Sequence, residues 1–434
     1  MDPRQIKIFA HSSTPRLKYI AGIILGDILG LPWEIVTDRR KLGKHPVINY
    51  TTLNLAGSCK ITPDPLLFDT GVREMEIPVT LWKNLPVFFP ASVDSDIPFD
   101  IFAASFFLVT RYEEYLEFKA DEHGRFKASS SLAFKHGFLD IPVVDLWAKE
   151  FSKILLKKYP TIAFKRNEFQ SLLTIDTDQP FAWLGKNLLK SVGGFIRDWT
   201  RKSENAIDRY KVVTHEKKDP YEVFDYIMDC IGKYNSDVRF FFPVGDNSKY
   251  DKNPSWKNDE YRNFITKIIA KYNFGLHPSY YAADNLSLLV SEYERLKAIT
   301  GIDFTSGRFH YIRLKTPVSF SNLCKAGISE DYSMGYPDEP GFRAGISRPY
   351  LFYDVAKDEQ TSLKIIPFQV MDATLYQYKK LDAASSKEII LKLISETRKA
   401  GGLFVSLWHN TSLLATPEGQ AWRELFETML KAQQ

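Results

Sequence analysis

Cysteine is scarce in this sequence, and no apolar run is long enough to cross a membrane. The 434 residues include only three cysteines, Cys59, Cys230 and Cys324, which are odd in number and far apart. Such usage excludes a disulfide framework and a cysteine metal motif, and it favours a reducing compartment. The apolar segment 19–31 is interrupted by Asp27 and is too short for a bilayer, so we expect no transmembrane segment.

An excess of one charge is also missing. The formal net charge is +4 at pH 7, with acids and bases interspersed, so we expect no nucleic-acid partner. The N-terminus lacks the apolar core and cleavage site of a signal peptide, which favours a cytoplasmic protein. A chain whose signal had been removed would look the same, and the oligomeric state is not indicated by the sequence.

The length and the 44% hydrophobic content predict two domains, or three, with large cores. Residues 1–165 are interpreted as a small mixed α/β domain of unknown role. Its segment 98–115 is apolar nearly all round and predicts a helix buried on several sides. Arg111, Glu113 and Glu114 at the end of this segment are interpreted as surface ion pairs, with an interdomain groove as the alternative.

Residues 166–434 alternate strand-like and helix-like segments, which is the pattern of a parallel sheet or barrel. Six such units in this length suit a (β/α) barrel, complete or incomplete. The expected strands are 172–175, 238–244, 274–277, 308–312, 365–370 and 403–408. The expected helices are 182–200, 221–233, 259–272, 286–300, 386–399 and 417–431.

The stretch from Ser171 to Pro180 is the most informative part of the chain. An apolar run, typical of a buried strand, ends in two carboxylates, Asp176 and Asp178. Because residues two apart on a strand point to the same side, both carboxylates should face one point at the strand's C-terminal end. Like charges so close repel unless a cation lies between them. The alternative is an Asp-rich turn that caps the next helix.

Histidines gather at expected strand ends in the same half of the chain. Of the eight histidines, His277, His310 and His409 follow or end the predicted strands. One histidine at a strand end is usually a satisfied structural group. Three of them, with Asp176 and Asp178 at one rim, indicate a functional site. We find no comparable set in residues 1–165.

The ordered motifs of this half resemble a known family. They are Thr-Ile-Asp-Thr-Asp (174–178), Leu-His-Pro-Ser (276–279), Arg-Phe-His-Tyr (308–311), Asp-Tyr-Ser (331–333) and Leu-Trp-His (407–409). This order resembles the polysaccharide deacetylases with the NodB homology domain, which are the carbohydrate esterases of family four. The phrases at 331–335 and 341–345 resemble a branch typical of Bacteroidetes-type bacteria, in which an extra N-terminal domain precedes the deacetylase-like one.

The resemblance implies a distorted (β/α) barrel of the NodB type that removes acetyl groups from the amides of a glycan with a divalent metal, zinc first among the candidates. It covers the second domain, residues 166–434. The implied roles are general base for Asp176, its orienting arginine for Arg308, metal ligands for Asp178 and His277, general acid for His409 and the carboxylate that tunes this acid for Asp331.

The metal motif departs from the family pattern at one position. The family has a second histidine four residues after the first, and Tyr281 occupies that position here. A zinc site normally has three protein ligands. The third ligand is therefore open among Tyr281, His310 and Asp246, or it is absent.

Several side chains are candidates for contacts with the sugar. Tyr311 and Trp408 could stack on a sugar face, and Arg343 lies in a glycine-flexed loop that could reach a substrate. A structural salt bridge for Arg343 and a core position for the aromatic residues are the alternatives.

The sequence therefore predicts a hydrolase acting on N-acetylated sugars of a glycan or glycan precursor. A glycan-binding protein that kept the fold and lost turnover is the alternative, and Tyr281 motivates it. A glycosidase is disfavoured, because Asp176 and Asp178 on one strand face are too close together to flank a sugar.

Overall fold

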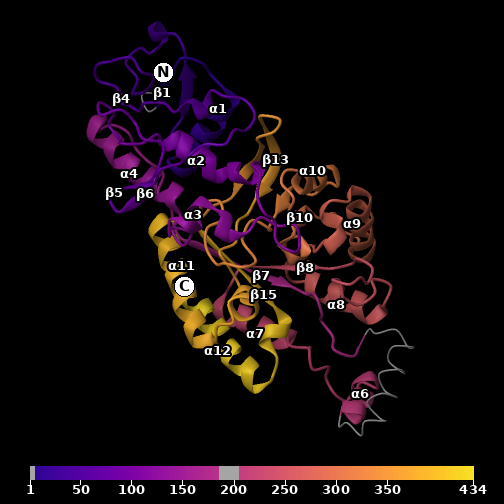
Figure 1. Ribbon diagram of the computed structural model, residues 1–434. Coiled ribbons are helices and arrows are strands. Elements are labelled where there is room, and N and C mark those ends of the chain that lie inside the picture. The colour runs from indigo at the N-terminus through magenta and orange to yellow at the C-terminus, as the bar shows by residue number, and fades with distance from the viewer. Residues whose placement is uncertain (1–4, 185–204) are drawn as a thin grey trace.

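The computed structural model describes residues 5–184 and 205–434 (Figure 1). Most of the helix expected at 182–200 lies outside these residues. In Figure 1 the N-terminal region, residues 5–165, lies against one end of a larger C-terminal region, residues 166–434. Across the described ranges, no helix combines the length and apolar character that a membrane span requires.

The N-terminal region is built on a small parallel sheet covered by helices. The strand order is β2 (Trp33–Val36), β1 (Ile6–Ala10), β3 (Val47–Tyr50) and β4 (Cys59–Lys60). The α-helices of this region are α1 (Pro15–Ala21), α2 (Ile101–Val109), α3 (Leu132–Lys135) and α4 (Val143–Lys158). All nine residues of α2 are buried, which confirms the buried helix expected within 98–115.

A buried ion cluster joins the two regions where α2 ends. The Glu114 carboxylate accepts from Arg111 Nε at 2.8 Å and from Arg343 Nη2 at 2.9 Å, and Arg111 Nη2 donates to Tyr336 at 2.7 Å. Arg111, Glu114 and Arg343 are 1%, 6% and 2% exposed. Burial raises the pKa of Glu114, but Arg343 and Arg111 outweigh it and lower that pKa overall. The surface ion pairs expected for this segment are thus wrong, because the C-terminal region covers them.

The C-terminal region is organised around a nine-stranded sheet that is parallel except at one edge. Only β12 runs antiparallel, against β13. The order is β12 (Tyr350–Asp354), β13 (Glu359–Ile365), β11 (Glu330–Asp331), β10 (Ser306–Gly307), β9 (Asn273–Leu276), β8 (Val238–Phe242), β7 (Gln170–Asp176), β15 (Leu403–His409) and β14 (Val370–Met371).

This sheet curls round without closing. Strands β13 and β14 follow each other along the chain yet lie near opposite ends of the sheet order. The connection between them reaches both sides, because Ile366 N donates to Asp331 O and Gln369 N donates to Val405 O. Within the described residues no strand pairing joins β14 to β12 or β13. The mixed α/β class is confirmed, whereas the hydrogen bonds show a curved open sheet instead of the closed barrel.

Helices between the strands cover the outer face of this sheet (Figure 1). They are α7 (Phe224–Tyr234), α8 (Asp259–Ile269), α9 (Leu286–Thr300), α10 (Val318–Lys325) and α11 (Ala383–Ala400), together with α12 (Pro417–Ala432) after the last strand. Helix α6 (Asn205–Val213) lies away from the sheet in Figure 1. The strand expected at 308–312 is wrong. Strand β10 ends at Gly307, and the chain then turns through Tyr311, whose φ of 61° is incompatible with a strand.

Candidate metal and catalytic site

Acidic and imidazole side chains converge at the C-terminal ends of the central strands. Asp176 ends β7, and His409 ends β15 directly beside it, in the same register of the two paired strands. His277 follows β9, and His310 lies in the turn after β10. Thr177 donates its N–H and hydroxyl to Phe241 O, which leaves the carboxylates on either side of it free to face the rim.

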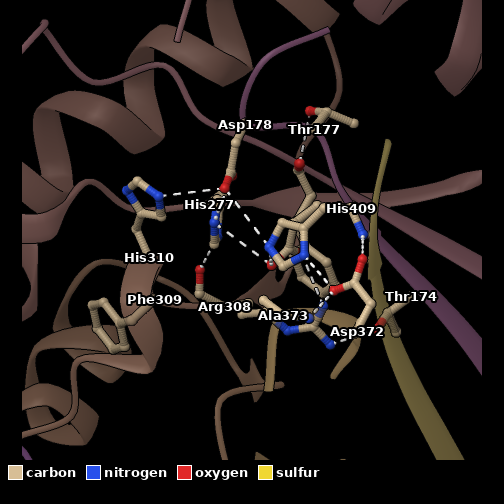
Figure 2. Close-up of polar contacts among 12 residues, drawn as sticks. Thr174, Thr177, Asp178, His277, Arg308, Phe309, His310, Asp372, Ala373 and His409 are labelled. Carbon is tan, nitrogen blue, oxygen red and sulfur yellow. Dashed lines mark hydrogen bonds and ion pairs between the residues drawn. The ribbon is translucent and has the colours of Figure 1, made fainter. Parts of the chain in front are cut away.

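The carboxylate of Asp178 lies at the centre of this group (Figure 2). His277 Nε2 is 3.1 Å from Asp178 Oδ1, His310 Nε2 is 3.4 Å from Asp178 Oδ2, and His409 Nε2 is 3.7 Å from Asp178 Oδ2. Ligand atoms of Asp178, His277 and His310 all lie within 4.8 Å of one another. The structure therefore brings together one carboxylate and two imidazoles at the spacing of a metal site. Among the sequence candidates for third ligand, it places His310 there.

The far nitrogen of each of these two imidazoles is held by a fixed partner. His277 Nδ1 lies 2.6 Å from Arg308 O, and His310 Nδ1 lies 2.8 Å from Asp251 Oδ1. Because a carbonyl and a carboxylate only accept, each Nδ1 carries the proton that makes the bond. In the neutral imidazole this leaves Nε2 as a lone pair directed at the centre, the arrangement that metal-binding histidines use.

Two acceptors therefore face each other inside the protein. Asp178 Oδ1 and His277 Nε2 are buried, and within the described residues neither takes part in a hydrogen bond. Buried polar atoms without partners are rare because their desolvation is not compensated. A cation between these atoms, or a proton shared by them, would resolve the mismatch. A carboxylate and two imidazoles form a donor set that suits zinc and similar divalent ions.

The charges around Asp178 favour its ionised form. Burial raises the pKa of Asp178, but the facing imidazoles of His310 and His277 outweigh it and hold the pKa well below its ordinary value. For His310, burial lowers the pKa, but the charges of Asp178 and Asp251 outweigh burial and raise the pKa to about 10. Asp178 is therefore an acceptor that either a metal or a protonated imidazole can neutralise.

Asp176 is oriented by a buried arginine. Arg308 Nη1 donates to Asp176 Oδ1 at 2.9 Å, and its Nη2 donates to Thr174 Oγ1 at 2.7 Å. The guanidinium is completely buried and lies 4.5 Å from the ring centre of Phe241. The second oxygen, Asp176 Oδ2, is turned toward the rim, 3.6 Å from His277 Nε2 and 4.0 Å from His409 Nε2.

A different carboxylate from the expected one contacts His409. Asp372 Oδ1 lies 2.7 Å from His409 Nδ1, and Asp372 Oδ2 accepts from the backbone N–H of His409. Burial lowers the pKa of His409, but Asp372 outweighs it and the pKa rises to about 9. Asp331, expected in this role, instead accepts from the N–H and hydroxyl of Ser333. Burial raises the pKa of Asp331 to about 6.

Two of the expected substrate contacts are corrected. Trp408 is 1% exposed, and its ring N–H points to Met429 Sδ under α12. Arg343 belongs to the interface cluster with Glu114. Neither side chain lines the cavity above the rim, because each is packed into the interior. Tyr311 does line it, and its contact with a sugar stays a prediction.

The cavity over the carboxylates has a volume of about 310 Å³, toward the small end of ligand pockets. Its floor is formed by Asp176, Asp178 and the three histidines, and its walls carry the aromatic rings Tyr250, Tyr311, Tyr376 and Tyr378 with Lys249. The other metal-ligand candidates lie elsewhere. Tyr281 is 47% exposed, and Asp246 pairs with Arg295 at 2.9 Å.

Sequence reasoning missed the roles of Asp251 and Asp372, although both follow or end predicted strands. The available signal was the position of each aspartate after a predicted strand. That position does not indicate which histidine each aspartate contacts.

The first part of the chain matches a known sequence family. Residues 6–160 match the profile of a family of unknown function, DUF7033. A search of the curated protein sequences gives no match.

Solved structures give distant similarities, each over part of this chain. A protein of Mycobacterium smegmatis designated a polysaccharide deacetylase is 14% identical, with a TM-score of 0.41 over 61% of this chain and 85% of that one. A CE4 family pseudoenzyme of Bacillus anthracis is 12% identical, with a TM-score of 0.32 over 62% of each chain. A mutant of this pseudoenzyme with restored enzymatic activity is also 12% identical, with a TM-score of 0.32, over 62% of this chain and 64% of that one. This chain thus spans less than two thirds of the pseudoenzyme, and at this distance the similarity assigns no activity.

Proposed function

We propose that the protein is a metal-dependent hydrolase that removes acyl groups from the amides of N-acetylated sugars in a glycan or glycan precursor. The observation that carries this proposal is the convergence of Asp176 and His409, with Nε2 and Oδ2 4.0 Å apart, beside the cluster of Asp178, His277 and His310. A base and an acid beside a metal-ligand set are the groups that amide hydrolysis needs.

The metal ligands in this proposal are Asp178, His277 and His310. The set fits a divalent ion because both imidazoles present Nε2 to the carboxylate while their Nδ1 atoms are held. A zinc ion bound there would polarise the acyl carbonyl and make a water molecule more nucleophilic at neutral pH. The set differs from the family pattern, since the second histidine comes from the turn after β10 instead of from the segment that follows His277.

The protein's own groups divide the proton transfers. Asp176 Oδ2 faces the rim and accepts the proton of the attacking water, while Arg308 fixes the orientation of the carboxylate through Oδ1. His409 donates a proton from Nε2 to the departing amine, which is a poor leaving group without it. Asp372 holds His409 through Nδ1 and keeps the imidazole in the orientation and charge state that this donation needs.

The walls of the cavity suit a sugar. The rings of Tyr250, Tyr311, Tyr376 and Tyr378 offer apolar faces and hydroxyl groups around the acidic floor. Aromatic faces pack against the C–H surfaces of a sugar ring, while hydroxyls and Lys249 hydrogen-bond its oxygens.

The test is release of acetate from N-acetylglucosamine oligomers, with zinc, cobalt or nickel added to metal-stripped protein. We expect turnover that depends on metal and is lost in Asp176→Asn, which keeps the size of the side chain. Absence of release from a broad panel of N-acetylated sugars, in protein that binds zinc, would contradict hydrolysis of these substrates.

The third ligand is tested separately by direct metal analysis. We expect one zinc per chain in the wild type and in Tyr281→Phe, and a loss of stoichiometric zinc in His310→Gln. Retention of zinc by His310→Gln would contradict this ligand set.

A catalytically inactive glycan-binding protein remains the second candidate, and one observation favours it. His310 lies between Asp178 and Asp251, so a protonated imidazole can neutralise the cluster without a metal. Stoichiometric zinc in protein purified without chelators would count against this candidate, and glycan binding without zinc or turnover would support it.

A further inference from the structure

We propose that the N-terminal region completes the substrate mouth: its turn at residues 121–125 positions the tyrosine wall of the cavity and thereby sets substrate affinity. The inference rests on the proposed function for its substrate. It concerns Arg125 and His123 as positioning residues, because neither lines the cavity itself, whereas Tyr311, which both contact, does.

Arg125 connects the turn to the wall. Its Nε donates to Asp121 Oδ2 at 2.7 Å within the turn, and its Nη1 donates to Tyr311 O at 2.6 Å in the C-terminal region. The same guanidinium lies 5.7 Å from the ring centre of Tyr378. Arg125 is only 4% exposed, so this contact is an enclosed one instead of a surface ion pair. One side chain therefore contacts two residues of the wall from separate segments of the sequence, Tyr311 through its backbone carbonyl and Tyr378 through its ring.

The backbone that Arg125 holds is in an unfavourable conformation. Tyr311 and Ile312 have φ of 61° and 51°, two consecutive residues with side chains in the left-handed region. Such residues persist only where the surroundings fix them, and they concentrate at functional sites. The hydrogen bond to Tyr311 O is one such constraint, and it comes from the other region of the chain. Without it, we expect the turn that carries Tyr311 to relax.

His123 supports the other end of the wall. Its Nδ1 lies 3.1 Å from the Tyr280 hydroxyl, and its ring centre lies 5.0 Å from that of Tyr311. Tyr280 in turn stacks on Tyr250, with ring centres 3.9 Å apart and planes 22° apart. Tyr250 faces the cavity, so the imidazole acts on the wall through Tyr280. The turn thus contacts the layer of aromatic residues directly behind the cavity surface.

This placement separates substrate binding from proton transfer. Across the described residues, the polar contacts of Arg125 and His123 go to Asp121, Glu122, Tyr280, Arg313, Tyr311 and Tyr378, and none goes to the carboxylates or histidines of the floor. The segment 308–313 also carries Arg308 and His310, but other contacts fix their side chains: Arg308 donates to Asp176 and Thr174, and His310 Nδ1 bonds Asp251. Loosening the backbone at Tyr311 should therefore weaken binding of the sugar more than it disturbs the groups that transfer protons.

The test compares Arg125→Met with Arg73→Met in the full-length, zinc-loaded protein. Arg73 is a matched control, because it pairs with Asp69 at the same four-residue spacing in the same region and is exposed. With N-acetylglucosamine oligomers as substrate, we expect Arg125→Met to raise KM roughly tenfold, the effect of losing a charged hydrogen bond, with kcat within about twofold. Arg125→Lys, which keeps a cationic donor, should restore part of the affinity.

Hydrogen exchange gives a readout that does not need turnover. We expect amides of residues 308–313 to exchange faster in Arg125→Met than in Arg73→Met or the wild type. If the wild type released no acetate, the proposed function would fail, and the exchange result would still decide whether the turn positions Tyr311.

Two results would overturn the inference: unchanged exchange at 308–313, or a fall in kcat at constant KM. His123→Phe keeps a ring in the turn and removes only the bond to Tyr280, so it provides a second test if Arg125→Met fails to fold. It should raise KM by a smaller factor, about threefold, and an unchanged KM would contradict the role given to His123.

Discussion

Two clusters of buried charge lie in this protein, one where the N-terminal and C-terminal regions meet and one at the C-terminal ends of the central strands. At the interface, Arg111 and Arg343 face Glu113 and Glu114, and the nitrogens of both guanidiniums donate to carboxylate, hydroxyl or carbonyl oxygens. Positive and negative charges are equal in number there. The interface cluster neutralises itself and needs nothing from outside.

The cluster at the strand ends is built differently. Asp176, Asp178, Asp251 and Asp372 face one guanidinium, that of Arg308, and imidazoles whose charge depends on a proton. Two of its buried acceptors, on Asp178 and His277, take no hydrogen bond within the described residues. The comparison teaches that burial of charge alone does not mark a site. A functional site is marked instead by buried carboxylates that outnumber the cationic groups around them and by acceptor atoms directed at one point.

The largest effect should come from removing the central acceptor of the strand-end cluster. Asp178→Asn keeps the shape and removes the charge that a cation needs, so we expect loss of stoichiometric zinc. We also expect a fall in kcat/KM of at least about 10³-fold, or ~4 kcal/mol. Titration calorimetry with zinc and acetate release would measure both. Asp246→Asn, at an exposed pair with Arg295, is the control and should change neither.

The interface cluster should respond in stability and not in metal binding. Glu114→Gln leaves Arg343 buried without an anionic partner and Arg111 with Glu113 alone, so the free energy of unfolding should fall by about 3–5 kcal/mol. Urea unfolding followed by fluorescence would measure this. Glu396→Gln breaks a surface pair with Lys399 and should cost less than about 1 kcal/mol. Equal effects of the two variants would mean that the buried cluster contributes no more than a surface pair.

The pH dependence of the free energy of unfolding should distinguish Asp331 from the carboxylates that pair with cations, and we expect an effect of similar size. Burial raises its pKa from 3.8 to about 6, so between these pH values the folded protein holds a proton that the unfolded chain has lost. Stability should therefore fall as pH rises from about 4 to about 6, with this group contributing up to ~3 kcal/mol. Asp331→Asn should lack that contribution, and Asp303→Asn, at an exposed aspartate, should retain it. Identical stability profiles for the wild type and Asp331→Asn would refute this account.

The smallest expected effect distinguishes Asp372, which contacts His409 in the structure, from Asp331, which the family resemblance implied for that role. Asp372→Asn should lower kcat roughly tenfold to hundredfold, because the imidazole loses the charge that orients it and keeps it protonated. The loss should be greatest above neutral pH, since Asp372 opposes the effect of burial in setting the pKa of His409 at about 9. Asp331→Asn should leave kcat within about twofold. The reverse order would return the role to Asp331.

The periodicity of the sequence predicted helices and strands well. It predicted poorly which side chains from distant segments contact each other. The helix expected at 286–300 is α9 (Leu286–Thr300), and the strand expected at 172–175 lies within β7, which ends at Asp176. Both local patterns depend on side-chain direction within one element.

Which carboxylate meets His409 depends on the order of strands in the sheet. Asp372 follows β14, the neighbour of β15, whereas Asp331 ends β11, which four strands separate from β15. No local pattern encodes that order. Contacts between distant segments also explain the wrong predictions for Arg111 and Arg343. Both are charged residues that would be expected at the surface, but segments distant along the chain bury them at the interface. Strands β10 and β11 have two residues each and leave almost no alternating pattern to detect.

The matched register of β7 and β15 has a consequence for how the gene can change. His409 faces the rim because it is level with Asp176 on the adjacent strand, and side chains alternate between the two faces at every residue. A single-codon deletion anywhere between Leu403 and Trp408 would turn the histidine to the opposite face, even though every residue of the site remained encoded. Sequence drift should thus tolerate substitutions within these strands far better than changes in their length.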